Sequence, residues 1–581
     1  MEEKGQHKIN EHTGQARAQK SILRAFSFIS IVIFIYVLLR SKFFLSDNEK
    51  YESKSDLLTS VCPYAEIVRP ISYYQDNKTL IKILNDEEFR KASAKKLSGA
   101  VRIKTDVFDD SPLVEDDPNF WEKKFSPFYE FLANSFPLLW QHATVERVNE
   151  WGLVITWKGE DESSEPILLA AHQDVVPTQD ATIKDWTYPP YEGVYDGKSL
   201  WGRGSADCKN LLIGLLEAAE ELIKDGFKPK RTIIYGFGFD EEIGGERGAK
   251  SIGNFLLERY GKNSFYAVID EGGQSIVEQE GVVLALPGTG EKGLLNLIVG
   301  LNTPGGHSSV PPDHTSIGIM AKLINRIESN PFPPIFSPLN PTFHEYQCVA
   351  IHSKSLDLKT KTAILRSGYD NKSNEIAVDY LTKSKTTRAL IGTTQAVDIV
   401  HGGAKSNALP EYVEIVVNHR IAIESTVNAT LAKDLANILF IAKKHNLGVI
   451  YDGTEIKRKT KNGFFTVKID WPLSPAPLTP INDEHWKLLA GTIRHVYEEV
   501  ARDSMPKKFK DKKVVVAPGI ATGNTDTQHY WDLTDHIYRY RPGLVATVDT
   551  NAHGVDEHIP FDSHLQIIAF YYEFLQVIDS A

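Results

Sequence analysis

The stretch from 167 to 177 reads ILLAAHQDVVP. Its five leading apolar residues predict a strand buried on both faces, and His172 and Asp174 follow two positions apart. Residues i and i+2 of an extended chain point to the same side, so the imidazole and the carboxylate face one way. In open α/β sheets, ligands bind beyond the carboxyl ends of parallel strands. The stretch therefore predicts an α/β fold with a site at this edge of the sheet.

Two further apolar runs and one helical pattern extend this strand into a sheet. RTIIYGFGF at 231–239 and YAVID at 266–270 have the length and composition of buried strands. Between the first two strands, apolar residues recur at helical spacing and Gly226 provides a stop signal. These apolar positions are Leu212, Leu215, Leu216, Ala219 and Ile223. Strands that alternate with helices predict a largely parallel sheet.

Acidic residues stand at the ends of the other predicted elements. They are Asp240–Glu242 after the second strand, Asp270 and Glu271 at the end of the third, and Asp207 before the helix. Taken singly, an Asp-Glu-Glu run is usually a solvated helix start, and an Asp before a helix is usually an N-cap. Together, so many carboxylates at one edge repel one another unless a divalent cation neutralises them. Histidine with aspartate and glutamate suits zinc, although cobalt or manganese would accept the same ligands.

Longer motifs carry a resemblance to a known family. They are HQDVVP, GRGSADCK, FDEEIGGERGA, GGHSSVPPDHT, SNALPEYVEIVVNHR and TGNTDTQHYW, in this order. In these motifs the chain resembles the co-catalytic zinc peptidases that include aminoacylases, glutamate carboxypeptidases and dipeptidases, and among them the fungal vacuolar carboxypeptidases. The resemblance implies an α/β, mostly parallel-sheet di-zinc peptidase domain with an inserted ferredoxin-like α+β lid domain. It also implies two Zn²⁺ per chain.

The resemblance assigns catalytic roles to residues at the predicted edge. The implied metal ligands are His172 and Asp270 for one metal, Glu242 and His553 for the other, and Asp207 bridging both. Glu241 would be the general base that takes the proton of the activated water and passes it to the leaving amine. Asp174 would fix the ring of His172 through its other nitrogen. His558 and His564 compete with His553, but they lack the Asp-Glu that follows it.

Four other residues match the family's substrate-binding positions. His307 matches the lid histidine that steadies the oxyanion, often from the partner subunit of a dimer. Arg420, in the strand EIVVNHRI, would bind a terminal carboxylate with two parallel hydrogen bonds, whereas a solvated edge arginine is the structural alternative. Asn407 and Gly523 match positions near the substrate.

The N-terminus predicts a membrane anchor. Residues 25–40 would form a transmembrane signal anchor between a cytoplasmic tail at 1–24 and a stem at 41–60, because 25–39 carry no charge and basic residues precede them. A cleaved signal peptide is the alternative, although no small-residue cleavage site follows. Sequons at Asn77, Asn371 and Asn428 fit a lumenal position for the rest of the chain.

After the stem, the order of the predicted helices and strands indicates a catalytic domain that is split in the sequence. We expect a catalytic domain built from two segments, 61–290 and 471–581, with the lid domain at 291–470 inserted between them. A segment at 342–392 is an extra insertion in the lid, and it puts the family's usual lid-to-lid homodimer in doubt. The resemblance places the protein in the vacuole as a single-pass type II membrane protein, with release of a soluble lumenal form as a further expectation.

Composition and motifs reduce the number of possible functions. The formal net charge of −11 argues against nucleic acid as a partner. Three cysteines in 581 residues exclude a disulfide framework but allow one bridge. The expected activity is zinc-dependent release of the C-terminal residue from short peptides, with glycine favoured in the penultimate position. N-acyl-amino-acid hydrolysis is the alternative, and a membrane-anchored receptor without catalysis is a remote one.

Overall fold

The computed structural model of the chain describes residues 61–504, 509–543 and 550–580. The predicted cytoplasmic tail, anchor and stem lie outside the described residues. Within the described ranges, no helix has both the length and the apolar character needed to cross a membrane. Residues from Tyr64 onward form one compact unit.

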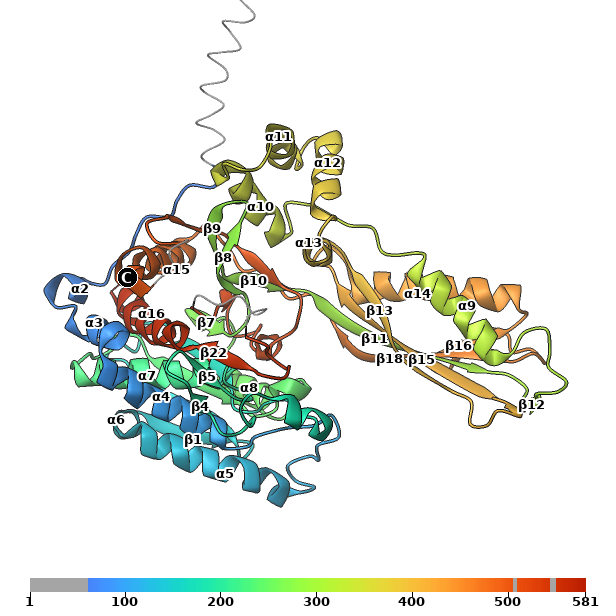
Figure 1. Cartoon of the computed structure of the whole chain (residues 1–581), viewed down its shortest axis with the longest axis horizontal. Coiled ribbons are helices and arrows are strands. Elements are labelled where there is room, and N and C mark those ends of the chain that lie inside the picture. The colour runs from blue at the N-terminus through green and yellow to red at the C-terminus, as the bar shows by residue number, and fades with distance from the viewer. Residues whose placement is uncertain (1–60, 505–508, 544–549, 581) are drawn as a thin grey trace, which may run out of the picture. The chain divides into compact units, whose positions relative to one another are not determined.

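The larger sheet has eight strands in the order β1-β2-β6-β3-β7-β21-β10-β20. Its strands β1, β7 and β10 are labelled in Figure 1. Their bounds are β1 Thr144–Val148, β2 Gly152–Trp157, β3 Ile167–His172, β6 Ile233–Gly238, β7 Ala267–Asp270, β10 Gly288–Glu291, β20 Gly519–Ala521 and β21 Ile537–Arg539. The neighbours β6, β3, β7 and β21 run parallel, as β10 and β20 do. The pairs β1–β2, β2–β6 and β10–β21 are antiparallel, so the sheet is mixed, with parallel pairs at four of its seven neighbouring positions. The short turn between β1 and β2 permits only antiparallel neighbours.

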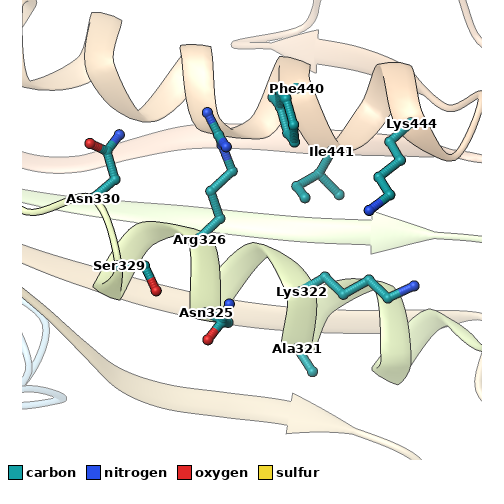
Figure 2. A pocket seen from close by; sticks show the side chains of 9 residues that line it. All are labelled: Ala321, Lys322, Asn325, Arg326, Ser329, Asn330, Phe440, Ile441 and Lys444. Carbon is teal, nitrogen blue, oxygen red and sulfur yellow. The ribbon is translucent and has the colours of Figure 1, made fainter.

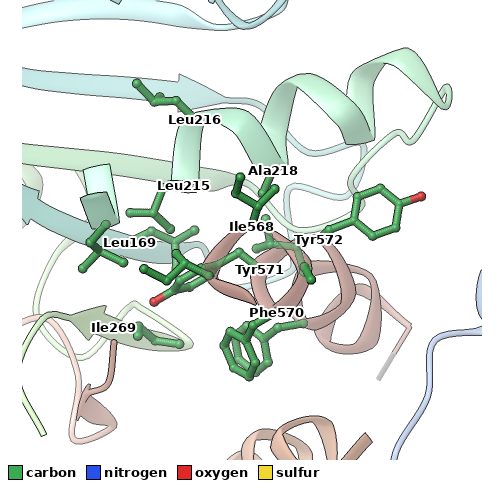
Figure 3. Packing of buried hydrophobic residues seen from close by; sticks show 14 of the residues in the cluster. Leu169, Leu215, Leu216, Ala218, Ile269, Ile568, Phe570, Tyr571 and Tyr572 are labelled. Carbon is green, nitrogen blue, oxygen red and sulfur yellow. The ribbon is translucent and has the colours of Figure 1, made fainter. Parts of the chain in front are cut away.

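Strand β3, which precedes the His-x-Asp motif, is buried on both faces. Leu169 lies in one apolar cluster with Leu215 of α7 and Ile568 of α16 (Figure 3). Leu168, one position earlier, lies in a second cluster with Ile252 of α8. The covering helices are α7 Lys209–Lys224, α8 Ala249–Tyr260 and α16 Phe561–Asp579. Because side chains alternate along a strand, a sheet with helices on both faces requires apolar residues at every position of the run.

A second sheet has six strands in the order β13-β15-β11-β18-β16-β17. Its strands are β11 Gly293–Asn302, β13 Thr394–Gly402, β15 Tyr412–Ile421, β16 Gly448–Tyr451, β17 Thr454–Lys457 and β18 Phe464–Leu473. Leu297 of β11 lies in one buried cluster with Leu323 of α9 (Ser316–Glu328) and Ile438 of α14 (Val427–Lys444). We call residues 293–473, without the helices described next, the small domain.

Four helices occupy the expected insertion. They are α10 Pro341–His352, α11 Leu358–Arg366, α12 Asn371–Leu381 and α13 Lys385–Leu390. The Tyr380 hydroxyl donates to Glu280 Oε1 at 2.7 Å, and the Ser353 hydroxyl donates to the Glu280 carbonyl at 2.8 Å. Glu280 lies in the turn between β8 (Gln274–Gln279) and β9 (Val282–Leu286), so the insertion is anchored outside the small domain.

The remaining elements complete the larger domain and one ribbon of the small domain. Helices α2 Ile71–Gln75, α3 Lys78–Asn85, α4 Glu87–Arg102, α5 Pro118–Ser135 and α6 Pro137–His142 precede β1, and α15 spans Glu484–His495. Short strands form three minor sheets, from β4 Val194–Tyr195, β5 Ser199–Trp201 and β22 His558–Pro560, from β8, β9 and β19 Val514–Val516, and from β12 Gly306–His307 and β14 Ala408–Leu409.

Candidate metal centre

The carboxyl ends of β3, β6 and β7 bring most of the predicted rim residues together. His172 is the last residue of β3, Glu241 and Glu242 follow β6, and Asp270 ends β7. Asp207 stands two residues before α7. Three groups of possible metal-ligating atoms result. Asp207 belongs to two of them, and the third combines His172 with Glu241 and Glu242.

The first group surrounds the buried ring of His172. Its Nε2 atom lies 3.4 Å from Asp207 Oδ1 and 3.4 Å from Glu271 Oε1. Glu241 Oε2 lies 4.0 Å from the same nitrogen. Nδ1, on the other side of the ring, lies 3.0 Å from the backbone oxygen of Asp174 and fixes the orientation of the imidazole.

The second group surrounds His553, which lies near the C-terminal end of the chain. Its Nε2 atom is 3.2 Å from Asp207 Oδ2 and 3.1 Å from Glu242 Oε2. Asp207 therefore directs one carboxylate oxygen to each of these two groups. This is the arrangement of a bridging carboxylate between two cations.

Glu271, and not Asp270, is the acidic residue of the 266–271 segment that approaches His172. The Asp270 Oδ1 atom accepts a hydrogen bond from the Glu271 backbone amide at 2.8 Å, and Asp270 belongs to none of these groups. The backbone oxygen of Asp270 is still part of the sheet, accepting from the Tyr540 amide at 2.8 Å. The chain leaves the strand at Gly272, whose φ of +91° suits glycine, and so Glu271 projects over the rim.

The Asp174 carboxylate lies near the other ring nitrogen of His172, the one that it was expected to fix, and it has two further partners. Its Oδ1 and Oδ2 atoms accept hydrogen bonds from the backbone amides of Glu241 and Glu242, at 3.1 and 3.0 Å. Oδ1 lies 3.4 Å from His172 Nδ1. The residue thus links the histidine, through its backbone, to the loop that carries the two glutamates.

The electrostatics of the rim indicate that negative charge is in excess. Burial raises the pKa of Glu242 to about 7 and that of Asp270 to about 7. Burial also raises the pKa of Glu241 well above its usual range, and that of Glu271. Hydrogen bonds to Asp207 and Glu242 raise the pKa of His553 to about 10. A cation between these groups would favour the ionised carboxylates and the neutral imidazoles.

The donor set fits zinc. Imidazole nitrogens and carboxylate oxygens are its ligands in hydrolytic sites. Glu242 Oε1 is buried and has no hydrogen-bond partner among the described residues, so it can turn to a metal without losing a bond. The first group also includes the Cys208 sulfur, but burial raises the pKa of this thiol well above the usual range, as expected for a packed side chain.

Two buried carboxylates of the site were not predicted from the sequence. Glu557 Oε1 accepts from the backbone amides of Gly204, Ala206 and Asp207 at 3.0, 2.9 and 3.1 Å, and Oε2 pairs with Arg203. The Asp-Glu that follows His553 was the visible signal, but it did not reveal that the glutamate positions the loop of Asp207. Glu557 positions that loop because three of the loop's backbone amides converge on one of its carboxylate oxygens.

Asp526 is the second of these carboxylates. A Cβ atom at Gly238 or Gly245 would lie 2.5 or 2.2 Å from one of its carboxylate oxygens, so both glycines make room for it. Burial raises its pKa well above the usual range, and within the described residues neither oxygen has a hydrogen-bond partner. The motif TGNTD contained it, but only Gly523 was singled out there.

The four predicted substrate-binding residues fall into two places. Arg420 Nη1 donates to Asn524 Oδ1 at 2.7 Å, and the Asn524 amide donates to the Lys292 backbone oxygen at 2.7 Å. Gly523, beside Asn524, has open space next to its Cα. Arg420 pairs with Leu294 at the beginning of β11, where the small domain joins the larger one.

His307 and Asn407 lie near the other end of β11. His307 is exposed on β12, its Nδ1 lies 2.7 Å from the Ser309 hydroxyl, and the Ser308 amide donates to the Asn407 backbone oxygen. β11 carries ten residues between the two places, which separates them by roughly 30 Å. The structure therefore does not bring His307 and Arg420 together within one chain.

A groove between α9 and α14 is not a second candidate catalytic site. Figure 2 shows that Lys322, Arg326 and Lys444 line it, with the Arg326 guanidinium 3.7 Å from the Phe440 ring centre. None of its nine lining residues is a carboxylate or a histidine. It offers no acid–base pair and no metal ligands.

Comparison with known proteins agrees with this geometry. The model of the peptidase family M20/M25/M40 matches residues 168–577. Carboxypeptidase S of Saccharomyces cerevisiae is 42% identical over 518 residues, which cover 88% of this chain and 88% of that protein. The N-fatty-acyl-amino acid synthase/hydrolase of Bos taurus is 30% identical over 500 residues, covering 84% of this chain and 88% of that protein.

Solved structures share the fold at low sequence identity. Human carnosine dipeptidase 1 gives a TM-score of 0.57 at 14% identity and covers 88% of this chain and 100% of its own. The M20 family metallo-carboxypeptidase Sso-CP2 of Sulfolobus solfataricus gives 0.55 at 15% identity, covering 84% of this chain and 99% of its own. The chain belongs to the peptidase family M20/M25/M40, as the motifs predicted, and it is a metal-dependent hydrolase.

Proposed function

We propose that the protein is a zinc-dependent carboxypeptidase that releases the C-terminal amino acid from short peptides, with glycine favoured at the penultimate position. The single observation that carries this proposal is the position of Asp207, whose two oxygens lie 3.4 and 3.2 Å from the nitrogens of His172 and His553. A shared carboxylate of this kind holds two metals a few ångströms apart. The 42% identity to carboxypeptidase S supports the choice of substrate class.

Two zinc ions would be held by five side chains. The proposed ligands are His172 and Glu271 for one ion, Glu242 and His553 for the other, and Asp207 for both. Glu271 takes the place that we expected Asp270 to hold, because only Glu271 approaches His172. Bound zinc supplies a water with a pKa near neutrality and polarises the scissile carbonyl.

Glu241 is the proposed general base. Its carboxylate stands 4.0 Å from His172 Nε2, beside the ligands and not among the closest atoms. Burial raises the pKa of Glu241, and a more basic carboxylate is better suited to take a proton and return it to the leaving amine. Asp174 holds the Glu241 and Glu242 amides, and thereby keeps the base and its neighbouring ligand at fixed positions.

Arg420 is the proposed partner of the substrate's terminal carboxylate. Its side chain is half-buried and already oriented by Asn524. A guanidinium can bind a carboxylate with two parallel hydrogen bonds, and one of them would replace or add to the bond with Asn524. Gly523 leaves the space beside this pair open.

The small domain is the proposed lid, and His307 is proposed to act in the site of a second copy. Within one chain, His307 lies roughly 30 Å along β11 from the Arg420 end. Its exposed ring would reach an oxyanion in a partner's site if two small domains paired. The edge strand β13 exposes Ile399 and Val400, which is consistent with such pairing.

A second candidate function is hydrolysis of N-acyl amino acids. It is favoured by the 30% identity to an N-fatty-acyl-amino acid synthase/hydrolase. Both activities leave a free carboxylate for Arg420 and use the same metals. They differ in the group on the other side of the scissile amide, which is a peptide in one case and an acyl chain in the other.

The sequence from residue 61 onward, loaded with zinc, should be assayed on an N-blocked glycyl-leucine and on an N-fatty-acyl leucine, each with and without a chelator. We expect chelator-sensitive release of leucine from the blocked dipeptide. Release mainly from the acyl substrate would replace the proposed function by the second candidate. Release from neither, with two zinc ions bound, would contradict both.

In the cell, we propose a vacuolar, type II membrane protein with a lumenal catalytic domain. The support is the similarity to carboxypeptidase S and the apolar segment at 25–40. N-terminal sequencing of the membrane-bound form should begin before residue 25. A start beyond residue 40 in that fraction would indicate a cleaved signal peptide instead.

A further inference from the structure

A further group of possible metal-ligating side chains lies away from the rim, where α15 begins. It consists of Asp483, His485 and His536, whose ligand atoms lie within 4.8 Å of one another. Asp483 caps α15 and His485 is the second residue of that helix, whereas His536 directly precedes β21. We propose that these three side chains form a separate, structural binding site for a zinc-like transition-metal ion.

The distances between the three ligands bracket those of a metal site. Asp483 Oδ2 lies 2.8 Å from His536 Nε2 and 4.0 Å from His485 Nδ1. A tetrahedral ion with bonds of about 2.0–2.1 Å needs ligand atoms roughly 3.4 Å apart. The two rings would have to rotate about their side-chain bonds to meet this requirement. Three protein ligands leave the fourth position to water, because all three side chains are partly exposed.

The two imidazole rings of the group lie against each other. Their centroids are 3.8 Å apart and their planes differ by 18°, so they are stacked. The lone pair of a ring nitrogen lies in the ring plane, and one ring must therefore turn out of the stack for both to bind one ion. A metal ion would take the place of the proton between Asp483 and His536.

Each ligand is also held from behind, which fixes its direction. Asp483 Oδ1 accepts from the Trp486 amide at 3.1 Å as the helix cap, and this leaves Oδ2 for an ion. The His485 ring packs 4.3 Å from the ring of Tyr266. The backbone of His536 is bound on both sides, with its amide donating to Thr534 and its oxygen accepting from Val268.

The ion would join two segments that are far apart in the sequence. Asp483 and His485 stand at the return of the chain from the small domain, and His536 leads into β21, the neighbour of β7. Because Val268 belongs to β7, the strand that ends at Asp270, the metal would brace the start of α15 against the strand behind the rim. The site shares no residue with the rim and does not depend on the proposed function.

The test is the uptake of zinc by protein whose tighter sites have first been saturated with zinc and freed of excess by gel filtration. Calorimetric titration with zinc alone should show one further ion in the parent protein. Asp483→Asn keeps a capping oxygen for the Trp486 amide but weakens the ligand, and we expect at least tenfold weaker binding. His485→Gln/His536→Gln should lose the ion. His401→Gln, which alters an exposed histidine of β13, is the matched control and should retain it.

Equal uptake by the parent, Asp483→Asn and His401→Gln would overturn the proposal, as would no further uptake by the parent. If the double variant does not fold, Asp483→Asn decides the question by itself. As a second readout, zinc should raise the Tm of the saturated parent and of His401→Gln, but not that of Asp483→Asn. The same rise in all three would also overturn the site.

Discussion

The rim of the larger sheet and the sheet of the small domain distribute their predicted functional residues in opposite ways. At the rim, side chains from positions as distant as 172 and 553 lie within 3.4 Å of one carboxylate. In the small domain, Arg420 and His307 are separated by the length of β11. Parallel neighbouring strands end at one edge and concentrate side chains there, whereas a long antiparallel strand carries its two ends apart. Chemistry can therefore be complete at the rim of one chain, but a residue at the far end of the small domain needs another site to act on.

The largest effect should come from the base at the rim. We expect Glu241→Gln to lower kcat by about 10³-fold, since the amide cannot take the proton of the water. The metals should stay bound, because Glu241 is not proposed as a ligand. Turnover and zinc content measured on the same preparation check this. Loss of a zinc ion together with activity would show that Glu241 is a metal ligand and would contradict the proposed assignment of the rim residues.

The far end of the small domain comes next. We expect His307→Ala to lower kcat by about 10²-fold, as the loss of an oxyanion donor does. If His307 serves a partner's site, mixing His307→Ala with Glu241→Gln subunits creates one complete site per mixed dimer. Activity should then return to about a quarter of the parent value after equal mixing and exchange of subunits. A mixture no more active than its components would mean that His307 does not act across a dimer.

A matched pair of variants at the end of β7 distinguishes the two neighbouring acids of the rim. Glu271→Gln should weaken binding of one zinc ion and lower activity by about 100-fold, because it removes a proposed ligand. Asp270→Asn should change the zinc affinity and the activity by only a few-fold. Zinc affinity measured with a competing chelator tells the two variants apart. The reverse ranking would restore Asp270 as the ligand that the sequence indicated.

At the end of the small domain that joins the larger one, Arg420→Ala should raise KM by about 10–100-fold for substrates with a free C-terminal carboxylate. Substrates with a C-terminal amide should be little affected, since they offer no bidentate partner. Arg420→Lys keeps the positive charge but not the two parallel donors of the guanidinium, so its KM should lie between those of the parent and Arg420→Ala. Equal losses on acid and amide would remove the proposed carboxylate contact.

The smallest effect concerns a buried acid outside both regions. Burial raises the pKa of Glu345, in α10, to about 7, against a hydrogen bond with Gln279 that lowers it. Because the folded-state pKa lies above the unfolded one, the protonated form stabilises the fold at low pH, and this contribution is lost as the pH rises toward 7. Glu345→Gln should therefore be more stable than the parent at pH 8, by about 1–3 kcal/mol. Urea unfolding at pH 5 and pH 8 measures this, and an equal difference at both values would contradict it.

The sequence predicted the strands and the rim well because both follow from local patterns. Each predicted rim residue stands next to the end or the beginning of an element: His172 ends an apolar run, the acidic residues follow β6, and Asp207 precedes α7. The topology of the parallel strands then brings these residues to one edge of the sheet. The family motifs supplied His553, which no local pattern connects to the other rim residues. The antiparallel edge strands were missed because pairing direction depends on partners distant in the sequence.

Other features of the site could not be read from periodicity. The choice between Asp270 and Glu271 depends on where the chain leaves β7, which Gly272 decides through its backbone and not through a side-chain pattern. Besides its contact with His172, the carboxylate of Asp174 accepts hydrogen bonds from two amides of the loop after β6, which no sequence pattern indicated. Glu557 and Asp526 act through converging backbone and through space left by glycines, which become visible only when the chain is folded.

The most direct test of the proposed two-metal centre is anomalous X-ray diffraction from crystals of the zinc-loaded protein, measured at the zinc absorption edge. We expect two peaks at the rim. One should lie at bonding distance from His172 and Glu271, the other from Glu242 and His553, and Asp207 should touch both. A single peak at the rim, or a peak bound by Asp270 with Glu271 turned away, would contradict this centre.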